Sequence, residues 1–179
     1  GIYSRKIFLN RKRFIKWKEK QNILNSKYKE LICLCKELKC DFSENEILKK
    51  YTSFKIGGPA DLFLHVKNID SLKKIMKKIN SENIPFFILG KGSNLLVADE
   101  GYKGVVISLE SDFKNITLEN ENIICAAGTS LAKACVFSMQ NELSGLEFAW
   151  GIPGSCGGAL FMNAGAYGND ISDVILEAT

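Results

Sequence analysis

Residues 88–109 read ILGKGSNLLVADEGYKGVVISL, and this stretch decides how the middle of the chain folds. The apolar runs Phe86–Leu89, Leu95–Val97 and Val105–Ile107 are short and are separated by glycine-containing segments. Short apolar runs bounded by glycine predict buried strands rather than helices. The stretch therefore predicts three strands, with a glycine-rich loop between the first two and a Gly101/Gly104 turn before the third.

A strand–helix–strand unit precedes this loop. Leu62–Val66 reads as a strand, and Asp70 is a good N-cap for the helix that follows it. That helix is marked by apolar residues at three- and four-residue spacing, which are Leu72, Ile75, Met76 and Ile79. It is long enough for a right-handed crossover to a parallel strand at Phe86–Leu89.

The residues after the loop predict a more hairpin-rich part. Ile116–Leu118 and Ile123–Ala126 flank a polar connection and read as a hairpin. Ser130 is a candidate cap for a helix that runs to about Gln140, and a glycine-rich region follows from Gly145. We therefore expect an α+β fold, with a small strand–helix–strand unit first and a larger mixed sheet with helices second.

The amino-terminal residues predict a separate segment. Residues 1–30 carry ten Lys or Arg against two Glu, so the excess of positive charge belongs to this end. An amphipathic helix follows, with its apolar stripe at Leu24, Tyr28, Leu31, Cys35 and Leu38. The polar residues 41–50 read as a linker. We assign residues 1–40 to a basic extension with a helix and residues 41–179 to the main domain, divided at about 51–90 and 91–179.

Composition narrows the class of protein. The 179 residues fit one domain or two small ones, and 46% hydrophobic residues allow a real core. No stretch approaches a membrane span and no secretory signal is present, so we expect a cytoplasmic protein with no membrane or nucleic-acid partner. The alternative that stays open is a binding module that uses the basic arm on RNA or an anionic membrane. Both chain ends look incomplete, since residues 173–179 read as a strand stopped in mid-run.

The six cysteines predict free thiols in a reducing compartment. They lack the paired spacing of a zinc site, and the only histidine, His65, is distant and reads as a surface residue. We therefore expect no metal site and no disulfide framework. Asp99 and Glu100 precede Gly101 and read as a solvated turn rather than a catalytic carboxylate pair.

The first glycine-rich loop has the character of a phosphate-binding segment. Leu89-Gly-Lys-Gly-Ser-Asn-Leu95 follows an apolar strand, and successive N–H groups in such a turn form an anion-binding concavity. The loop lacks the GxxxxGK[ST] spacing of a Walker A motif. Leu95 stands where a dinucleotide-binding GxGxxG fingerprint needs its third glycine. A plain turn between strands remains the alternative.

Two more glycine-rich segments point to a bound ligand. Gly151-Ile-Pro-Gly-Ser-Cys-Gly-Gly-Ala159 holds four glycines and a proline, which specify a tight loop, although a packed turn explains it too. Asn163-Ala-Gly-Ala-Tyr-Gly168 is built from small residues, so a flat aromatic ligand could lie against its backbone. Tyr167 would then stack or hydrogen-bond; a buried tyrosine is the alternative.

Three segments in this order carry a resemblance to a known family: KIGGPADLFL (55–64), ILGKGSNLLVADEGYKGVVISL (88–109) and LSGLEFAWGIPGSCGGALFMNAGAYG (143–168). From residue 51 onward, the chain resembles the UDP-N-acetylenolpyruvoylglucosamine reductases, also called UDP-N-acetylmuramate dehydrogenases. The resemblance implies the amino-terminal FAD-binding domain of the PCMH type, with two subdomains and the cofactor between them. Trp150 and Cys156 depart from the small or aliphatic residues that are usual in the family.

The resemblance also implies the residues of the FAD site. The first loop would cradle the pyrophosphate, Gly128 and the second loop would line the flavin cleft, and the third segment would lie near the isoalloxazine ring. The full implied set is Leu89, Gly90, Lys91, Gly92, Ser93, Asn94, Leu95, Gly128, Gly151, Ile152, Pro153, Gly154, Ser155, Gly157, Gly158, Ala159, Asn163, Ala164, Gly165, Ala166, Tyr167 and Gly168.

The implied activity is the NADPH-dependent reduction of a UDP-sugar enolpyruvyl ether in peptidoglycan synthesis. The family's catalytic Arg, Ser and Glu belong to the region after this domain, so we expect no catalytic residue in this chain, no turnover, and a missing carboxyl-terminal substrate domain. One alternative is the FAD-binding domain of another PCMH-type oxidoreductase, some of which attach FAD through His or Cys. Another is a fragment that does not fold alone and aggregates.

Overall fold

The computed structural model describes residues 27–179, and its largest element is a four-stranded mixed sheet. The strands are β1 (Asp41–Ile47), β2 (Pro59–Val66), β4 (Tyr102–Leu109) and β3 (Phe86–Leu89), in that spatial order. β1 runs antiparallel to β2, whereas β2 and β3 both run parallel to β4. β4 is therefore an inner strand that pairs with β2 on one side and with the edge strand β3 on the other.

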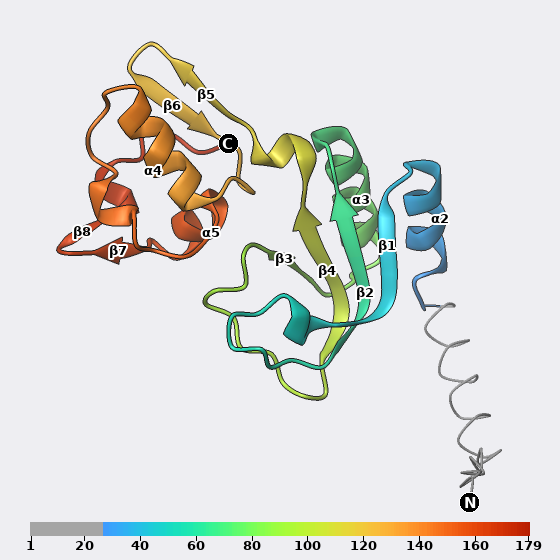
Figure 1. Ribbon diagram of the computed structural model, residues 1–179. Helices are drawn as coiled ribbons and strands as arrows, with labels where there is room; N and C mark the ends of the chain where they lie inside the picture. Colours follow the sequence, from blue (N-terminus) through green and yellow to red (C-terminus); the bar gives the residue numbers. More distant parts are fainter. Residues whose placement is uncertain (1–26) are drawn as a thin grey trace, which may run out of the picture.

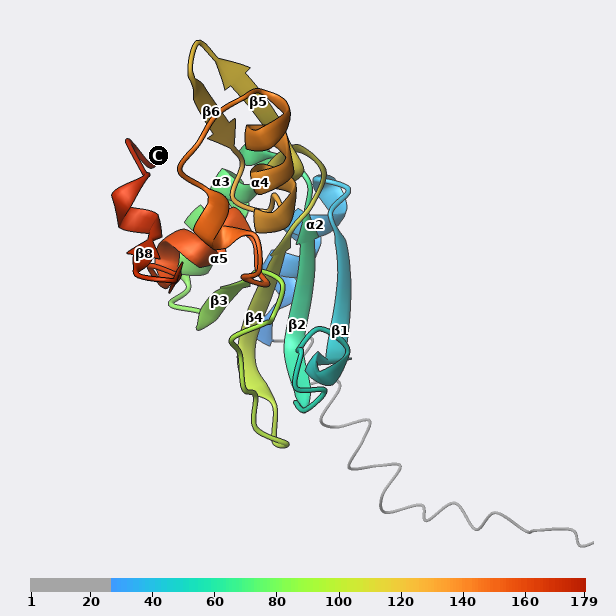
Figure 2. The ribbon, with the colours of Figure 1, turned by 60° about the vertical axis from the view of Figure 1, so that its left-hand side comes forward.

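Two helices cover one face of this sheet, as Figures 1 and 2 show. They are α2 (Lys29–Glu37) and α3 (Ile69–Ser81), and both pack into the same apolar cluster. α3 connects β2 to β3, two parallel strands of one sheet, so the predicted strand–helix–strand crossover is confirmed. The cap lies two residues earlier than expected, because the side chain of Asn68, not Asp70, accepts the N–H of Ser71 at 2.9 Å.

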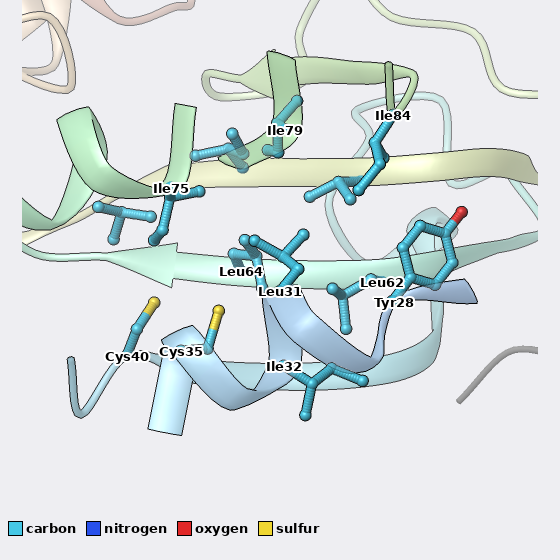
Figure 3. Packing of buried hydrophobic residues seen from close by; sticks show 13 residues of the cluster. Tyr28, Leu31, Ile32, Cys35, Cys40, Leu62, Leu64, Ile75, Ile79 and Ile84 are labelled. Carbon is cyan, nitrogen blue, oxygen red and sulfur yellow. The ribbon is translucent and has the colours of Figure 1, made fainter. Parts of the chain in front are cut away.

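The alternation of side chains along β2 and β4 creates two apolar clusters. Leu62, Leu64, Val105 and Ile107 point toward the helices, whereas Phe63 and Val106 point to the opposite face. Figure 3 shows the helix-side cluster, where side chains of α2 and α3 meet those of β2. Its buried members are Tyr28, Leu31, Ile32, Cys35, Cys40, Leu62, Leu64, Val66, Ile75, Ile79, Ile84, Val105 and Ile107.

The helix α2 is an integral part of this core rather than of a separate extension. Tyr28 is buried and donates its hydroxyl hydrogen bond to Asp61 Oδ2, at 3.0 Å, on β2. Lys27 and Lys103 lie 3.8 and 3.5 Å from the same carboxylate. The predicted stripe is confirmed for Tyr28, Leu31 and Cys35. Leu24 and most of the basic arm lie outside the described residues.

Two expected segments differ in the structure. The stretch 41–50, expected to be a linker, forms β1 and a 3-10 turn at Leu48–Lys50, because its backbone pairs with β2 although its side chains are mostly polar. Leu95–Val97, expected to be a strand, has no strand partner and instead places Val97 in the cluster on the far face of the sheet.

Residues 111–179 form a second lobe, separated in Figure 1 from the first lobe at residues 27–110. It contains the hairpin of β5 (Ile116–Glu119) and β6 (Asn122–Cys125), which confirms the predicted hairpin. Ser130 caps α4 (Leu131–Gln140) by accepting the N–H of Lys133, also as predicted. The remaining regular elements are α5 (Cys156–Phe161), β7 (Gly165–Ala166), β8 (Asn169–Asp170) and 3-10 turns at Ser111–Lys114, Glu147–Ala149 and Ile171–Asp173.

The α+β class is confirmed, with one difference in how the strands are distributed. The larger sheet lies in the first lobe, because β4 inserts between β2 and β3 and not beside the later strands. This sheet therefore includes residues on both sides of position 90, where the sequence analysis divided the two parts. Residues 174–179 pair with no strand in the described chain, and Leu176 among them is exposed.

Candidate functional site

A cleft of about 1300 Å³ lies between the two lobes and is lined by residues from both. Its first wall comes from β3, the loop after it and residues 50–55. Its second wall comes from residues 127–128, 152–155, 157–159 and 161–165. Ligand sites in proteins commonly enclose about 300–1,000 Å³, so this open cleft has room for a large, extended molecule.

The loop after β3 is shaped by a glycine that no other residue could replace without strain. Gly92 has φ of +63°, and a Cβ on it would lie 2.0 Å from the carbonyl oxygen of Tyr51. The Gly92 carbonyl accepts the N–H of Ser53 at 3.0 Å, which joins the loop to residues 51–53. The close approach of these two backbones fixes the curvature of the loop.

The same loop leaves its backbone donors unused. In the described part of the chain, no N–H group of residues 91–95 donates to a protein acceptor. Backbone N–H groups that lack a protein partner need water or a ligand, and several in succession form a concavity that binds anions. The loop therefore has the donor set that a phosphate or pyrophosphate requires.

A hydrogen bond links this loop to the second lobe. The Ser93 hydroxyl donates to the carbonyl oxygen of Pro153 at 2.7 Å. Ser155, two residues further, is buried and caps α5 by accepting the N–H of Gly158 at 3.2 Å. Gly90 lies against this cap, since a Cβ on it would be 2.7 Å from Ser155 Oγ. The first two glycine loops are thus in direct contact across the cleft.

The second wall is held by backbone hydrogen bonds between distant segments. Gly157 donates to Ala127 and Cys156 donates to Thr129, both at 2.8 Å, and Leu131 donates to Gly154 at 3.0 Å. A Cβ on Gly157 would lie 2.8 Å from Ala127 Cβ, so a larger residue there would separate the two segments. The part of the wall at residues 127–128 and 157–159 therefore consists of small residues, which leaves the backbone accessible to a ligand.

The third segment contributes only its first half to the cleft. Asn163 Oδ1 accepts the N–H of Ser172 at 2.9 Å, and the Ala164 N–H donates to Ala159 at 2.8 Å. These bonds hold Asn163, Ala164 and Gly165 at the cleft wall. Tyr167 is 92% exposed and does not line the cleft, so it is neither a buried core tyrosine nor a wall residue in this structure.

The structure brings most of the sequence-derived site residues together. Those that line the cleft are Leu89, Gly90, Lys91, Gly92, Ser93, Asn94, Leu95, Gly128, Ile152, Pro153, Gly154, Ser155, Gly157, Gly158, Ala159, Asn163, Ala164 and Gly165. Those that do not are Gly151, Ala166, Tyr167 and Gly168. Cys156, the only cysteine in the three glycine-rich segments and so the thiol that a covalent flavin link would need, is also absent from the lining.

Sequence reasoning missed one part of the first wall. Residues 50–53 and Lys55 line the cleft beside the glycine loop, although the sequence analysis assigned no site residue to this stretch. Thr52 is buried and donates its hydroxyl to the carbonyl oxygen of Ile56 at 2.8 Å, which fixes the turn. The signal available was the position of this stretch just before Gly57-Gly58-Pro59. Phe161 and Met162 also line the cleft and were not singled out.

The charges around the cleft favour an anionic ligand. Four lysines line it, Lys50, Lys55, Lys91 and Lys114, against one carboxylate, Glu110. Burial opposes ionisation of Glu110, but hydrogen bonds from Lys114 and Ser108 outweigh it and lower the pKa of the carboxyl. The ionised Glu110 carboxylate therefore accepts hydrogen bonds from Lys114 and Ser108 and is not arranged as a proton donor.

The other residues considered from sequence have structural surroundings. His65 lies on β2, tilted against Phe63 and 3.9 Å from Glu110, and Asp99 and Glu100 are exposed in a turn. Within residues 27–179 no cluster of His, Cys, Asp and Glu has the geometry of a metal site. No helix in that same range is long and apolar enough to cross a bilayer. Trp150 is exposed and does not overpack the second loop.

Comparisons with known proteins agree on the class of domain. A family model described as "FAD binding domain" matches residues 60–179. UDP-N-acetylenolpyruvoylglucosamine reductase of Caldanaerobacter subterraneus subsp. tengcongensis is 49% identical over 131 residues, which cover 73% of this chain and 43% of that protein. The protein of the same name from Bacillus subtilis is 45% identical over 134 residues, which cover 75% and 44%.

A solved structure gives the same picture. The crystal structure of UDP-N-acetylenolpyruvylglucosamine reductase from Thermus caldophilus superposes with a TM-score of 0.61 at 36% identity, covering 75% of this chain and 46% of that one. The chain therefore spans less than half the length of each of these relatives.

Proposed function

This chain belongs to the FAD-binding domain family, and from that membership we propose that it is the flavin-binding part of a UDP-N-acetylenolpyruvoylglucosamine reductase. The observation that carries the proposal is the loop at residues 90–95. Its free N–H groups, the positive φ of Gly92 and the hydrogen bond from Ser93 to Pro153 support an anion-binding concavity at the contact between the two lobes.

The residues present fit FAD in two respects. The donors at 91–95, with Lys91 and Lys55 nearby, match the charge of a pyrophosphate, since backbone N–H groups and ammonium groups both stabilise phosphate oxygens. The small residues of the second wall, Gly157–Ala159 and Asn163–Gly165, leave room for a planar ring against the backbone. Phe161, at the edge of this wall and 88% exposed, would shield such a ring from water.

Bound FAD would supply hydride transfer from NADPH to the enolpyruvyl group of a UDP-sugar, the step that forms UDP-N-acetylmuramate in peptidoglycan synthesis. The part of this chain would be to bind and orient the cofactor and to exclude water from one side of it. Polarisation and protonation of the substrate would fall to residues outside this chain. We accordingly propose a cytoplasmic protein whose partners are small molecules, with no nucleic acid among them, and which binds FAD without turning over substrate.

The competing flavoprotein hypothesis, covalent attachment of FAD through a thiol, has less support. Cys156 would be its candidate, but Cys156 does not line the cleft. A flavin that remains with the protein after denaturation and desalting would revive that hypothesis.

The test is an equilibrium FAD titration of the purified chain, followed by its visible absorption spectrum after desalting. We expect a retained and perturbed flavin band. Gly92→Ala should weaken binding at least tenfold, because alanine is strained at positive φ and its Cβ would collide with Tyr51. Gly151→Ala is the matched control, since a Cβ there meets nothing within 4 Å, and should change the affinity by less than about twofold.

Thermal unfolding of both variants separates loss of binding from loss of folding. A folded wild-type chain with no flavin affinity would contradict the proposal. Equal affinities for the Gly92→Ala and Gly151→Ala proteins would remove the loop at residues 90–95 from the binding site.

A further inference from the structure

The helix layer of the first lobe, which consists of α2 and α3 with their flanking residues at 27–40 and 68–82, is basic. It holds eight lysines against four carboxylates, whereas residues 111–179 hold two lysines against eight carboxylates. Figures 1 and 2 show the two helices on the same face of the sheet. The described chain is therefore divided into a basic helix layer and an acidic second lobe.

The lysines of this layer point outward. On α3, Lys73, Lys74 and Lys77 are exposed and share one side of the helix, opposite the residues that enter the core. On α2, Lys29 and Lys36 are also exposed, and their seven-residue spacing places both on one side. The outer surface of the two helices is thus a lysine face, formed by Lys29, Lys36, Lys39, Lys73, Lys74 and Lys77.

Carboxylates do not neutralise this lysine face. Glu30 and Glu82 both bind Lys78, which lies between the two helices and is half-buried. Within residues 27–179, no carboxylate lies within 4 Å of any lysine of the lysine face. Lys67, elsewhere in the same lobe, pairs with Asp41 at 2.6 Å. The lysine face therefore keeps its charge available for an external anion.

The sequence that leads into α2 has the same charge. Residues 1–26 of the basic arm, which lie outside the described residues, carry eight Lys or Arg against one Glu. Large apolar side chains are interspersed with these charges, among them Ile7, Phe8, Leu9, Phe14, Ile15 and Trp17. This composition suits the interface of an anionic bilayer, where basic groups contact the headgroups and apolar groups enter the acyl boundary.

We propose that the lysine face and the basic arm attach the chain peripherally to an anionic phospholipid surface. This attachment goes beyond the proposed binding of FAD. The expectation of no membrane partner rested on the lack of a membrane span and of a secretory signal, and neither bears on binding to a lipid surface. A lipid surface fits the arm better than RNA does, because Ile and Leu side chains enter a bilayer but do not stack on bases.

Attachment through the lysine face would leave the cleft accessible. None of the six lysines of that face lines the cleft. Tyr51, Leu89 and Leu95 do line it, and they pack into the apolar cluster on the sheet face opposite the helices. We therefore expect lipid binding and FAD binding to be independent of each other.

The test is co-sedimentation of the whole 179-residue chain with vesicles in the absence of FAD. The chain should bind vesicles of phosphatidylcholine and phosphatidylglycerol about tenfold or more tightly than vesicles of phosphatidylcholine alone. It should dissociate when the salt concentration rises from about 0.1 M to about 1 M, because screening then shortens the reach of the charges. Equal binding to both vesicles, or binding to neither, would overturn the proposal. Binding to polyuridylate RNA without binding to the anionic vesicles would overturn it in favour of a nucleic-acid partner.

Charge reversals separate the lysine face from the net charge of the chain. Lys73→Glu combined with Lys77→Glu should weaken binding to the anionic vesicles by about tenfold or more. Lys49→Glu combined with Lys133→Glu is the matched control, since it changes the net charge equally at exposed positions outside the helix layer. The control should weaken binding by less than about threefold, because charges more than a Debye length from the lipid are screened. Equal losses of vesicle binding would refute the role of the lysine face.

Thermal unfolding and FAD titration of both charge-reversed proteins separate loss of lipid binding from loss of folding. Both proteins should unfold and bind FAD as the wild-type chain does, since none of the four lysines lines the cleft. A Lys73→Glu, Lys77→Glu protein that loses vesicle binding only because it is unfolded would contradict the assignment.

Tryptophan fluorescence tests the contribution of the basic arm. The chain has two tryptophans, Trp17 and Trp150, so the Trp150→Phe protein reports on Trp17 alone. Its emission should shift to shorter wavelength when anionic vesicles are added, because the indole ring enters the membrane interface. Vesicle binding without any shift would contradict the insertion of the arm.

Discussion

The two lobes of this chain bury their apolar side chains in different ways. In the first lobe, helices and loops cover both faces of a four-stranded sheet, and residues such as Leu62, Phe63 and Ile107 are completely inaccessible. In the second lobe, the apolar cluster has only six buried residues, three of them on α4 and α5, and large apolar side chains such as Phe161 and Leu176 face solvent. The first lobe has the core of an ordinary domain, whereas the second has a small one.

Because of this difference, we expect the two lobes to contribute unequally to the stability of the chain. Most of the buried apolar residues belong to the first lobe, so that lobe should carry most of the free energy of unfolding. The second lobe supplies one wall of the cleft, and this wall is joined by backbone hydrogen bonds and by a hydrogen bond from the glycine loop of the first lobe. Elements with few buried contacts open more readily, so we expect the second lobe to exchange its amide hydrogens faster.

The largest effect should come from the core of the first lobe. Phe63 is inaccessible and stacks on Tyr51, with ring centroids 4.5 Å apart. Phe63→Ala should lower the free energy of unfolding by about 3–5 kcal/mol through loss of burial and creation of a cavity, as measured by urea denaturation. Phe161→Ala, which truncates an exposed ring of the second lobe, should change it by less than about 0.5 kcal/mol. Equal losses of unfolding free energy for the two variants would contradict the proposed difference in core packing between the lobes.

The next largest effect concerns the attachment of α2 to the first lobe. Tyr28→Phe removes the hydrogen bond to Asp61 and leaves that buried carboxylate with only its two lysines. The free energy of unfolding should fall by about 1–3 kcal/mol. Tyr167→Phe, which changes a tyrosine that is almost fully exposed, is the control and should have no effect. A Tyr28→Phe protein as stable as wild type would show that α2 is only loosely attached.

The Tyr28 hydroxyl also predicts a pH dependence. Burial, and then the hydrogen bond to Asp61, raise the pKa of Tyr28 above its ordinary value of 10.0. The folded state therefore holds this proton more tightly than the unfolded state, so the contribution is complete below pH 10 and is lost as the pH rises through the raised pKa. Stability measured from pH 8 upward should fall more steeply for wild type than for the Tyr28→Phe protein. Parallel profiles would contradict this origin.

The elements that could be predicted from sequence are those whose local pattern and tertiary role agree. The helix at residues 69–81 shows an apolar stripe, β2 and β4 are apolar runs at the centre of the sheet, and β3 is an apolar run at its edge. β1 could not be predicted, because DFSENEI has mostly polar residues and its strand form depends on pairing with β2. The strand predicted at Leu95–Val97 was wrong for the opposite reason. The segment is apolar, but it has no partner strand and instead packs against the sheet.

The candidate site shows the same limit. Glycine spacing located the loop at residues 90–95 and the small-residue wall, because glycine is required where backbones approach closely. The contribution of residues 50–55 could not be read from their types, since it follows from the contact between the Tyr51 carbonyl and Gly92. The exposure of Tyr167 was equally invisible, because the sequence does not say which side of the third segment faces the cleft.

A smaller effect should come from the hydrogen bond between the lobes. Ser93→Ala removes the bond from its hydroxyl to Pro153, at 2.7 Å, while leaving the loop backbone intact. FAD affinity should fall by about two- to tenfold, which corresponds to one hydrogen bond, whereas thermal stability stays nearly unchanged. Ser81→Ala, which removes a hydroxyl bond to Lys78 at the end of α3, should bind FAD as wild type does. If both variants bind alike, the link does not position the two walls.

The smallest effect should lie at the connection between the lobes, where Lys114 pairs with Glu110. Both side chains are partly exposed, so water screens the pair, and Lys114→Ala should cost less than about 0.5 kcal/mol of unfolding free energy. Burial raises the pKa of Glu110, whereas hydrogen bonds from Lys114 and Ser108 lower it. The net effect is a pKa below the ordinary value of 4.5. Any contribution therefore exists above that value and is lost as the pH falls through the lowered pKa. A double-mutant cycle with Glu110→Gln measures the coupling free energy between the two side chains. A coupling above about 1 kcal/mol would mean that this pair, rather than the hydrogen bond of Ser93, fixes the relative position of the lobes.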